Sequence, residues 1–482
     1  MRNLQSGHLL LASPAMTVAD TQPDFDPAPP HDRAFLGHPK GLGYLSFTEA
    51  CERFSYYSMQ SLLVLYMVKY LLLPGHVENV VGLAWLRTHF YAGLEGQPLA
   101  SAVFGTYTSL VYATPILGGI IADKWLGRHM TLIAGGICMA IGHFLMAFEG
   151  SFLLALFALV IGVGLFKGNI ATQVGALYSD EDNRRAMAFQ IFYIAINASV
   201  IVAPLVSGTL GEKIGWHWGF GTAGVVMVLG LFIYISGKKW LPADDVRPNS
   251  VTDEPAPPPE RMDGNDWTRL IALLLLIPVL AISLLTNQEI FNAYLVWGDE
   301  HFALNFFGTT VPTSWLITLD AALSFSMLVA TAWFWKWWGK SHKEPDELGK
   351  IIIGSFFTVA GGLCLFMAAL TQPAGGKIGL FWPVMFHLMN SIGFSNILPV
   401  SLALFTKVAP RQVTATIVGL YYLAFFAANA IVGYVGGLYS SLPTTTFWLL
   451  HVASAAFGLV CFIIFKATMS KRMHHRTVPA TA

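Results

Sequence analysis

Five polar residues fall at helical spacing inside one apolar stretch near the N-terminus. They are Glu49, Glu52, Arg53, Tyr56 and Gln60, at offsets of 0, 3, 4, 7 and 11 residues, so a helix places them on one stripe. An unpaired charge at the centre of a membrane span costs at least about 2.5–3.5 kcal/mol, so charges there pair locally or face a wet cavity. The stretch predicts either a site that binds charged groups and exchanges protons, or a structural ion pair that fixes this helix against its neighbours.

A further cation, Lys167, stands in a later apolar stretch. Its neighbours Gly164 and Gly168 permit close helix approach. If this helix faces the first, Lys167 can neutralise one of Glu49 and Glu52 while Arg53 neutralises the other. Such a cluster is a proton switch, because protonating one carboxylate frees a cation to hold an anionic group. Snorkelling of Lys167 to a lipid headgroup is the alternative, and it is disfavoured because Lys167 lies deep in its stretch.

The helices that carry these residues must lie in a membrane. Of 482 residues, 55% are hydrophobic and only 12% are charged, against roughly 25% charged in soluble domains. The composition therefore predicts an all-α polytopic membrane protein. The formal net charge is zero, so no nucleic-acid partner is expected. The four cysteines are dispersed and no ligand spacing accompanies them, so no metal site is expected.

Twelve apolar runs are long enough to span a bilayer, six before residue 237 and six after residue 267. They cover about 44–72, 99–122, 130–149, 152–178, 186–210, 217–236, 268–297, 313–338, 349–370, 380–406, 412–438 and 445–467. We expect two six-helix bundles without an extra helix pair between them, a Pro-rich cytoplasmic linker and two cytoplasmic tails, the first of them disordered. The predicted boundaries are 1–40 for the first tail, 41–236 and 268–468 for the bundles, 237–267 for the linker and 469–482 for the second tail.

Basic residues predict the orientation. With the N-terminus placed inside, the tails and the loops on that side hold 22 of the 28 Lys and Arg residues. The excess of positive charge on cytoplasmic loops then places both termini in the cytoplasm of a plasma (inner) membrane. Two bundles joined by a cytoplasmic linker predict a substrate site between them near mid-membrane.

Four motifs follow one another through the first half of the chain. They are Glu49-x-x-Glu52-Arg53-Phe54-x-Tyr56-Tyr57, Gly118–Arg128, Phe166–Ile170 and Phe192-Tyr193-x-x-Ile196-Asn197-x-Ser199. Together they resemble the signature motifs of the proton-dependent oligopeptide transporters, a branch of the major facilitator superfamily. The resemblance is looser in the second half of the chain.

The resemblance implies a major facilitator fold and symport of protons with di- and tripeptides by alternating access, driven by the proton gradient without a cofactor. Arg53 and Lys167 would hold the peptide carboxylate and, with Glu49 and Glu52, take part in proton coupling. The implied pocket residues are Tyr56, Tyr57, Tyr107 and Asn197, and we place Gln288 and Asn396 among the candidate substrate-binding residues as well. Asp123 and Arg128 belong to a stretch that resembles the superfamily's cytoplasmic gate motif. We expect a monomer in the lipid bilayer, with small peptides and protons as its partners.

Two acids of the family pattern are replaced by uncharged residues. When the family's Gln is aligned with Gln288, Asn287 occupies the position where the family usually has Glu. In the tenth run Phe394 occupies the position of another family Glu. Asp320 stands where the family commonly has Asn. We hypothesise that Asp320 replaces one or both acids, as a proton site and as the counter-charge for the peptide ammonium. Two alternatives stay open: Asp320 only bonds its helix to a neighbour, or Glu289 is the acid of the seventh run in a shifted register.

Other buried polar residues have no spacing that suggests a role. His143, His387 and His451 stand alone on different runs, so we predict satisfied core residues rather than proton relays. Asn390, Asn396 and Asn429 either line the pocket or bridge helices, and the sequence does not separate these alternatives.

No catalytic motif accompanies these features. The sequence contains no Gly-x-Ser-x-Gly elbow, phosphate-binding loop or His-Glu-x-x-His pair, so an enzyme or an ATP-driven pump is not expected. Two other functions stay open: a proton-coupled carrier of another small zwitterion or anion on the same fold, and a channel or receptor.

Overall fold

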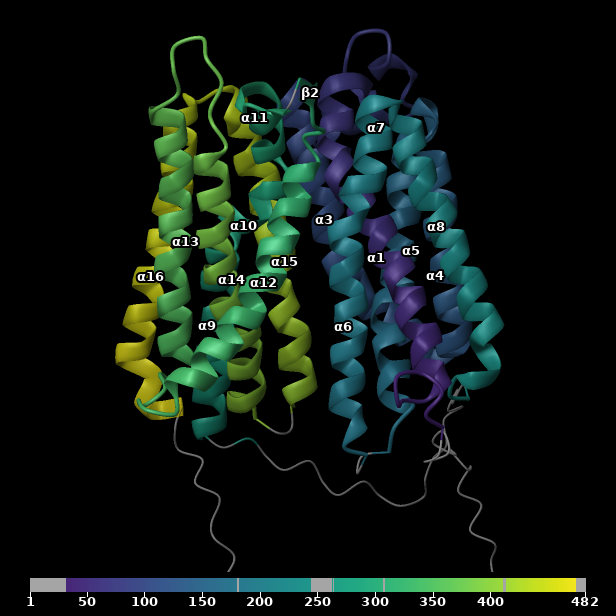
Figure 1. The fold of residues 1–482 in the computed structure, drawn as a ribbon, viewed down its shortest axis with the longest axis vertical. Coiled ribbons are helices and arrows are strands. Elements are labelled where there is room, and N and C mark those ends of the chain that lie inside the picture. Colours follow the sequence, from purple (N-terminus) through teal and green to yellow (C-terminus); the bar gives the residue numbers. More distant parts are fainter. Residues whose placement is uncertain are drawn as a thin grey trace, which may run out of the picture.

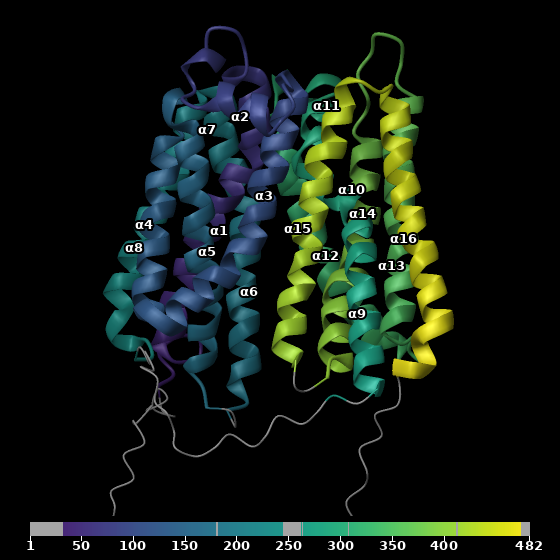
Figure 2. The same ribbon diagram turned by 180° about the vertical axis from the view of Figure 1, so that it is seen from behind.

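The structure, a computed structural model, describes residues 32–179, 182–243, 262, 264–306, 308–410 and 413–473. Most of the predicted first tail, the centre of the predicted linker and the end of the predicted second tail lie outside these residues. The described chain is helical except for one short hairpin, in which β1 (Asn305–Phe306) pairs with β2 (Thr309–Thr310). The helices form two groups that stand side by side, α1–α8 and α9–α16, which we call the N-terminal and C-terminal bundles (Figures 1 and 2).

The N-terminal bundle contains the first six predicted spans. Its helices are α1 (Lys40–Tyr66), α2 (Leu83–His89), α3 (Gly96–Ile121), α4 (Gly127–Leu145), α5 (Phe152–Ala176), α6 (Arg184–Ala203), α7 (Thr209–Lys213) and α8 (Trp216–Gly237). A π-helical turn, Pro204–Gly208, joins α6 to α7. Pro204 lacks the N–H that a regular helical bond requires, which accounts for the irregular turn at this point.

The C-terminal bundle contains the last six. Its helices are α9 (Gly264–Ser283), α10 (Leu285–Gln288), α11 (Ala293–His301), α12 (Trp315–Trp338), α13 (Glu347–Leu370), α14 (Phe381–Val408), α15 (Thr414–Gly437) and α16 (Thr444–Met473). The hairpin lies between α11 and α12.

The prediction of one continuous seventh span over 268–297 is wrong. Helix α9 ends at Ser283, and the chain passes through α10 and a 3₁₀ turn before α11 begins at Ala293. Asn292, at φ −124° and ψ −114°, leaves the helical region. The Glu289 side chain replaces one lost helical bond, because its Oε1 accepts from Ala293 N at 3.1 Å. Asn292 Nδ2 donates to the Val432 carbonyl at 3.2 Å and so joins the break to α15. An apolar pattern alone does not reveal such a break.

Ten helical segments of the described chain are long and apolar enough to cross a membrane. One of them, Gly96–Leu145, contains both α3 and α4. Helix α1 is not among the ten, since its charged and hydroxyl-bearing residues lower its hydropathy. With α1 added, these segments account for the twelve predicted spans.

The bundles meet mainly where α3 packs along α15 and where α6 packs on α12. Gly105 on α3 and Gly433 on α15 make this approach possible, since a Cβ on Gly105 would lie 2.4 Å from the Gly433 Cα. A larger side chain at either position would force the two bundles apart.

Candidate functional site

Three charges of α1 form one buried ion-pair group. Arg53 Nε lies 2.9 Å from Glu49 Oε1 and also pairs with Glu52, and all three side chains are buried. Arg53 lies between the two acids and contacts both, so the expected pairing of Lys167 with one carboxylate is not formed as a direct ion pair here. We call Glu49, Glu52, Arg53 and Lys167 the charge cluster.

Lys167 on α5 contacts an aromatic ring instead. It forms no ion pair within 4.0 Å among the described residues, and its Nζ lies 4.6 Å from the centroid of the Tyr112 ring on α3. Tyr112 in turn stacks on Phe425 of α15, with 5.0 Å between the centroids. Cation–π contact stabilises the ammonium by about 0.5–2 kcal/mol without occupying its hydrogen-bond donors, so Lys167 can still bind an anion. Tyr112 was not predicted, because nothing in the sequence distinguishes it from other aromatic residues.

Donors of the charge cluster remain available as well. Arg53 Nη2 and Tyr56 Oη are buried and have no hydrogen-bond partner within the described chain. Leaving a buried donor unsatisfied costs about 1–3 kcal/mol, so these atoms favour binding of a polar group. Two free donors beside a charge cluster whose formal charges cancel favour the binding of a carboxylate.

The predicted pocket tyrosines surround the charge cluster. The guanidinium carbon of Arg53 lies 5.5 Å from the centroid of the Tyr56 ring, and Tyr56 makes an edge-to-face contact with Tyr57. The Tyr57 ring reaches Phe291 at the break in the seventh helix, 6.4 Å between centroids, and so contacts the opposite bundle. Tyr107 is buried on α3.

The three predicted pocket amides all have partners within the protein, two of them local and one on another helix. Asn197 donates to the Tyr193 carbonyl of its own helix at 2.8 Å, and Gln288 donates to its neighbour Asn287 at 3.0 Å. Asn396 accepts from the Trp335 indole at 2.9 Å and therefore joins α14 to α12. Their places in a binding site stay predictions.

Asp320 forms a hydrogen-bonded chain that spans three helices. Its Oδ1 lies 2.9 Å from His387 Nδ1 on α14, and His387 Nε2 lies 2.8 Å from the hydroxyl of Tyr294 on α11. His387 is fully buried, whereas Asp320 keeps 8% of its surface exposed. His387 is thus satisfied as predicted, but the inference that it stands alone is wrong. Its partners lie 67 and 93 residues away in the sequence, beyond the reach of any spacing argument.

Glu289 has a histidine neighbour too. Its Oε2 lies 3.5 Å from His451 Nε2 on α16, and neither residue is exposed. His451 Nδ1 is satisfied by the Phe447 carbonyl at 3.0 Å, as predicted for a core residue, while Nε2 has no hydrogen-bond partner in the described chain. His143 is buried with no hydrogen-bond partner in the described parts of the chain, so the prediction that it is satisfied is wrong.

Known proteins with this sequence pattern are transporters. The sequence profile described as the POT family matches residues 129–254. Over 470 residues the chain is 30% identical to the uncharacterized transporter YclF of Bacillus subtilis (strain 168), an alignment that covers 86% of this chain and 91% of that protein. The chain belongs to the POT family.

Two further transporters extend the comparison. A di-/tripeptide transporter of Lactococcus lactis subsp. cremoris is 27% identical over 499 residues, which cover 90% of this chain and 97% of that protein. The crystal structure of a peptide transporter POT in complex with sulfate matches with a TM-score of 0.79 at 25% identity, over 92% of this chain and 96% of that one. The predicted family, the all-α major facilitator fold and the assignment as a transporter rather than an enzyme are confirmed.

In this POT transporter the bundles are bonded to each other at the end opposite the start of α1 and the end of α16 (Figure 1). Lys69, after α1, donates to Asp299 on α11 at 2.8 Å. Glu212 on α7 accepts from the backbone N–H groups of Thr313 and Ser314, at 2.7 and 2.8 Å, and so satisfies the free N-terminus of α12. We call these contacts the Lys69–Asp299 and Glu212 bridges.

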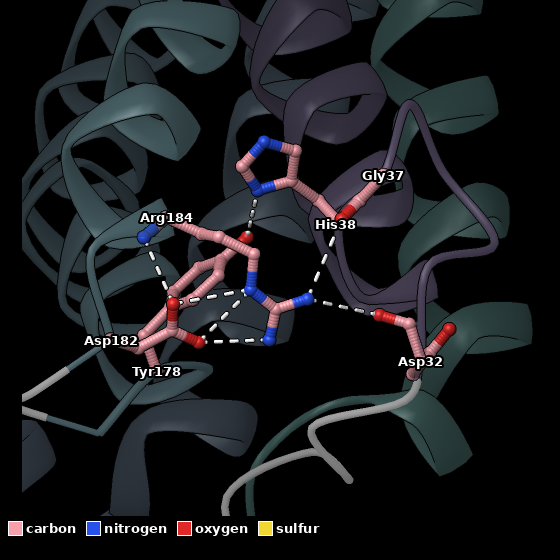
Figure 3. A network of polar contacts seen from close by, with 6 residues as sticks. All are labelled: Asp32, Gly37, His38, Tyr178, Asp182 and Arg184. Atoms are coloured by element: carbon pink, nitrogen blue, oxygen red, sulfur yellow. Dashed lines mark hydrogen bonds and ion pairs between the residues drawn. The ribbon is translucent and has the colours of Figure 1, made fainter.

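At the other end the POT transporter holds the segment before α1 against the turn between α5 and α6 (Figure 3). Arg184 pairs with Asp182 at 2.8 Å and donates to the carbonyls of Asp32 and Gly37, while His38 Nδ1 lies 2.9 Å from the Tyr178 hydroxyl. Arg184 holds the pKa of Asp182 below its usual range, and burial lowers the pKa of His38.

The predicted gate residues lie near this end. Asp123 is in a π-helical turn at the end of α3, and its Oδ1 lies 3.8 Å from Arg128 Nη2 on α4. The Asp123 side chain is largely exposed and that of Arg128 partly exposed, so this ion pair contributes little stability and can open readily.

Proposed function

We propose that the chain imports di- and tripeptides together with protons by alternating access, across a plasma membrane with both termini in the cytoplasm. The charge cluster carries this proposal. Two carboxylates balance two cations, so one added proton leaves a net positive charge beside free donors of Arg53 and Lys167. A peptide carboxylate is the group that such a site would bind. The name of the Lactococcus relative, a di-/tripeptide transporter, supports the substrate class.

Asp320 and His387 supply the second half of the coupling. In this proposal the imidazole accepts a proton at Nε2 while the Tyr294 hydroxyl changes from donor to acceptor, so His387 keeps both of its hydrogen-bond partners. Asp320 stays ionised and is the counter-charge for the peptide ammonium. No further acid is then needed in place of the family's Glu, whose position Phe394 occupies.

The two bridges and the cytoplasmic motif would serve as gates. The Lys69–Asp299 and Glu212 bridges join the bundles at the outer end, which favours a conformation open toward the cytoplasm. Opening outward would break both of them, while contacts near Asp123 and Arg128 would form on the inner side.

Dialanine uptake into liposomes under an imposed proton gradient tests the function. Concentrative uptake that tripeptides inhibit is expected, and Glu52→Gln should abolish the dependence on the gradient. A second candidate, a carrier of another small zwitterion or anion, is favoured only by the apolar residue at Phe394. Such a carrier would ignore the peptides, and a channel would dissipate the gradient without concentrating substrate.

A further inference from the structure

The proposed function assigns no role to a groove between the two bundles. Helices α3 and α15 stand side by side where the bundles meet (Figure 2). The groove follows this seam toward the outer end, where the loop 90–94 and Ser440 and Ser441 line it. Its volume is about 700 Å³, which is within the range of pockets that hold small organic molecules.

The two walls of the groove are bonded to each other. Near its inner end Ser109 Oγ on α3 donates to the Phe426 carbonyl on α15 at 3.0 Å. Near its outer end Gln97 Nε2 donates to the Gly436 carbonyl at 2.9 Å. The close glycine contact between α3 and α15 lies between these two bonds. The groove is therefore continuous with the bundle interface, and each bundle supplies one of its walls.

The chemistry of the lining favours an apolar ligand with one polar end. None of the described residues that line the groove carries a charge. The hydroxyls of Thr106 and Ser109 already donate to backbone carbonyls, so the middle of the groove offers apolar surface rather than free donors. Charged groups lie only beside the outer end, where Arg87 pairs with Glu95 at 2.9 Å. The apolar lining includes Phe90, Leu94, Ala102, Leu110, Phe426 and Ala430.

The length and the opening of the groove match one leaflet of the bilayer. Its residues on α3 extend from Pro98 to Leu110, a rise of about 18 Å at 1.5 Å per residue. One leaflet contributes about 15 Å of hydrocarbon, whereas a partner helix that spans the membrane needs about 30 Å. Leu110 and Tyr434 on the lining are exposed, while the predicted pocket residue Tyr107 is buried. The groove therefore opens toward lipid and lies on another side of α3 than the predicted pocket.

We propose that an acyl chain of an outer-leaflet phospholipid occupies this groove and stabilises the outward-closed conformation. The chain would contact both walls at once. Opening outward would separate α3 from α15 and divide those contacts, so the lipid binds the closed conformation more tightly and shifts the equilibrium toward it. The assignment to the outer leaflet and the effect on the transport cycle rest on the proposed function, but the binding of an acyl chain does not.

Photolabelling of the full-length protein tests the site without transport. In nanodiscs of phosphatidylcholine that carries a photoreactive diazirine on its acyl chain, labels are expected in residues 98–110 and 426–441. Ala430→Phe on one wall and Ala102→Phe on the other fill the groove, and each should abolish this labelling. Ala453→Phe adds the same bulk at an exposed position of α16 that does not line the groove, and should leave the labelling unchanged.

Two results would overturn the lipid site. One is labelling that is spread evenly over the exposed helices or that persists in both groove variants. The other is an unlabelled groove in nanodiscs that hold two copies of the chain joined at this seam, since the occupant would then be a second copy.

Hydrogen exchange tests the effect on conformation. Adding phosphatidylcholine to the protein in detergent should slow the exchange of backbone amides in residues 96–110 and 426–441, because the lipid opposes separation of the walls. The slowing should be lost in Ala430→Phe and kept in Ala453→Phe. Equal slowing in Ala430→Phe and the wild type would overturn the proposed stabilisation. Absence of dialanine uptake in the wild type would instead refute the proposed function, while a specifically labelled groove would still establish the lipid site.

Discussion

The two bundles hold their buried carboxylates in different ways. In the N-terminal bundle Glu49 and Glu52 share Arg53, which lies on the same turn and does not release its proton in proteins. In the C-terminal bundle Asp320 and Glu289 each face a histidine on another helix. An arginine provides a fixed charge that suits a carboxylate ligand. An imidazole can bind and release a proton, so we expect the second bundle to add a proton-exchange site to the anchoring and proton coupling that the charge cluster provides in the first.

The largest effect is expected where the fixed charge is lost. Arg53→Ala leaves two buried carboxylates without their partner, which costs about 3–5 kcal/mol and should abolish uptake. Arg53→Lys keeps the charge but cannot contact both acids with a planar fork, so we expect strongly reduced uptake with partial recovery of thermal stability. Dialanine uptake and the unfolding temperature in detergent measure the two effects. Uptake near the wild-type level in Arg53→Ala would show that Arg53 does not anchor the substrate.

The exchangeable site should respond differently. Asp320→Asn should reduce proton-driven uptake by about 10²-fold, because the imidazole loses its anionic partner, while peptide counterflow persists with a weaker affinity because the ammonium loses its counter-charge. His387→Asn should likewise reduce proton-driven uptake and keep counterflow. A substitution of Arg53, which would hold the peptide carboxylate, should abolish both activities. Proton-driven uptake at the wild-type rate in Asp320→Asn would leave Asp320 with only a structural role.

The aromatic support of Lys167 should have a moderate effect. Tyr112→Leu removes the ring beneath the ammonium and should weaken peptide binding by about 0.5–2 kcal/mol, the value of the cation–π contact. Tyr112→Phe keeps a ring and is the matched control, with an affinity close to that of the wild type. Competition binding of dialanine measures both. Equal affinities of the Tyr112→Leu and Tyr112→Phe variants would show that the aromatic ring contributes nothing to peptide binding.

The Lys69–Asp299 bridge should have a smaller effect. The Lys69 side chain is 42% exposed, so the pair contributes about 0.2–1 kcal/mol to the outward-closed conformation. Lys69→Ala and Asp299→Ala should each raise the accessibility of the outer side to a cysteine-labelling probe. A double variant no more accessible than either single variant would show that the two residues act as one bridge.

The smallest effect concerns the network at the start of α1. Because the pKa of Asp182 is lowered in the folded state, its ion pair stabilises the protein at neutral pH, and this contribution disappears as the pH falls through the lowered value. The lowered pKa of His38 acts in the same direction, since the unfolded chain binds the proton more readily below pH 6.5. Asp182→Asn should therefore flatten the acid side of the stability curve by less than about 1 kcal/mol, measured as unfolding temperature against pH.

Much of the N-terminal bundle could be predicted because its site is local. Glu49, Glu52 and Arg53 fall within one helical turn, so spacing alone places them together. Lys167 was identified by its burial in an apolar run, but its contact with Tyr112 was not, since that contact depends on how α5 packs against α3. The break at Glu289–Asn292 was missed for a similar reason: its backbone bonds are replaced by side chains that look like ordinary polar residues in the sequence.

The sequence by itself determined the membrane class, the twelve spans, the family and the ion-pair group of α1, because hydropathy, short motifs and helical periodicity are local properties. Only the tertiary structure decided the partners of Asp320 and Glu289. Each acid meets a histidine more than 60 residues away, through the packing of α12 on α14 and of the broken seventh helix on α16. Such pairings depend on how the helices pack in three dimensions. The spacing of residues along a single sequence does not reveal that packing.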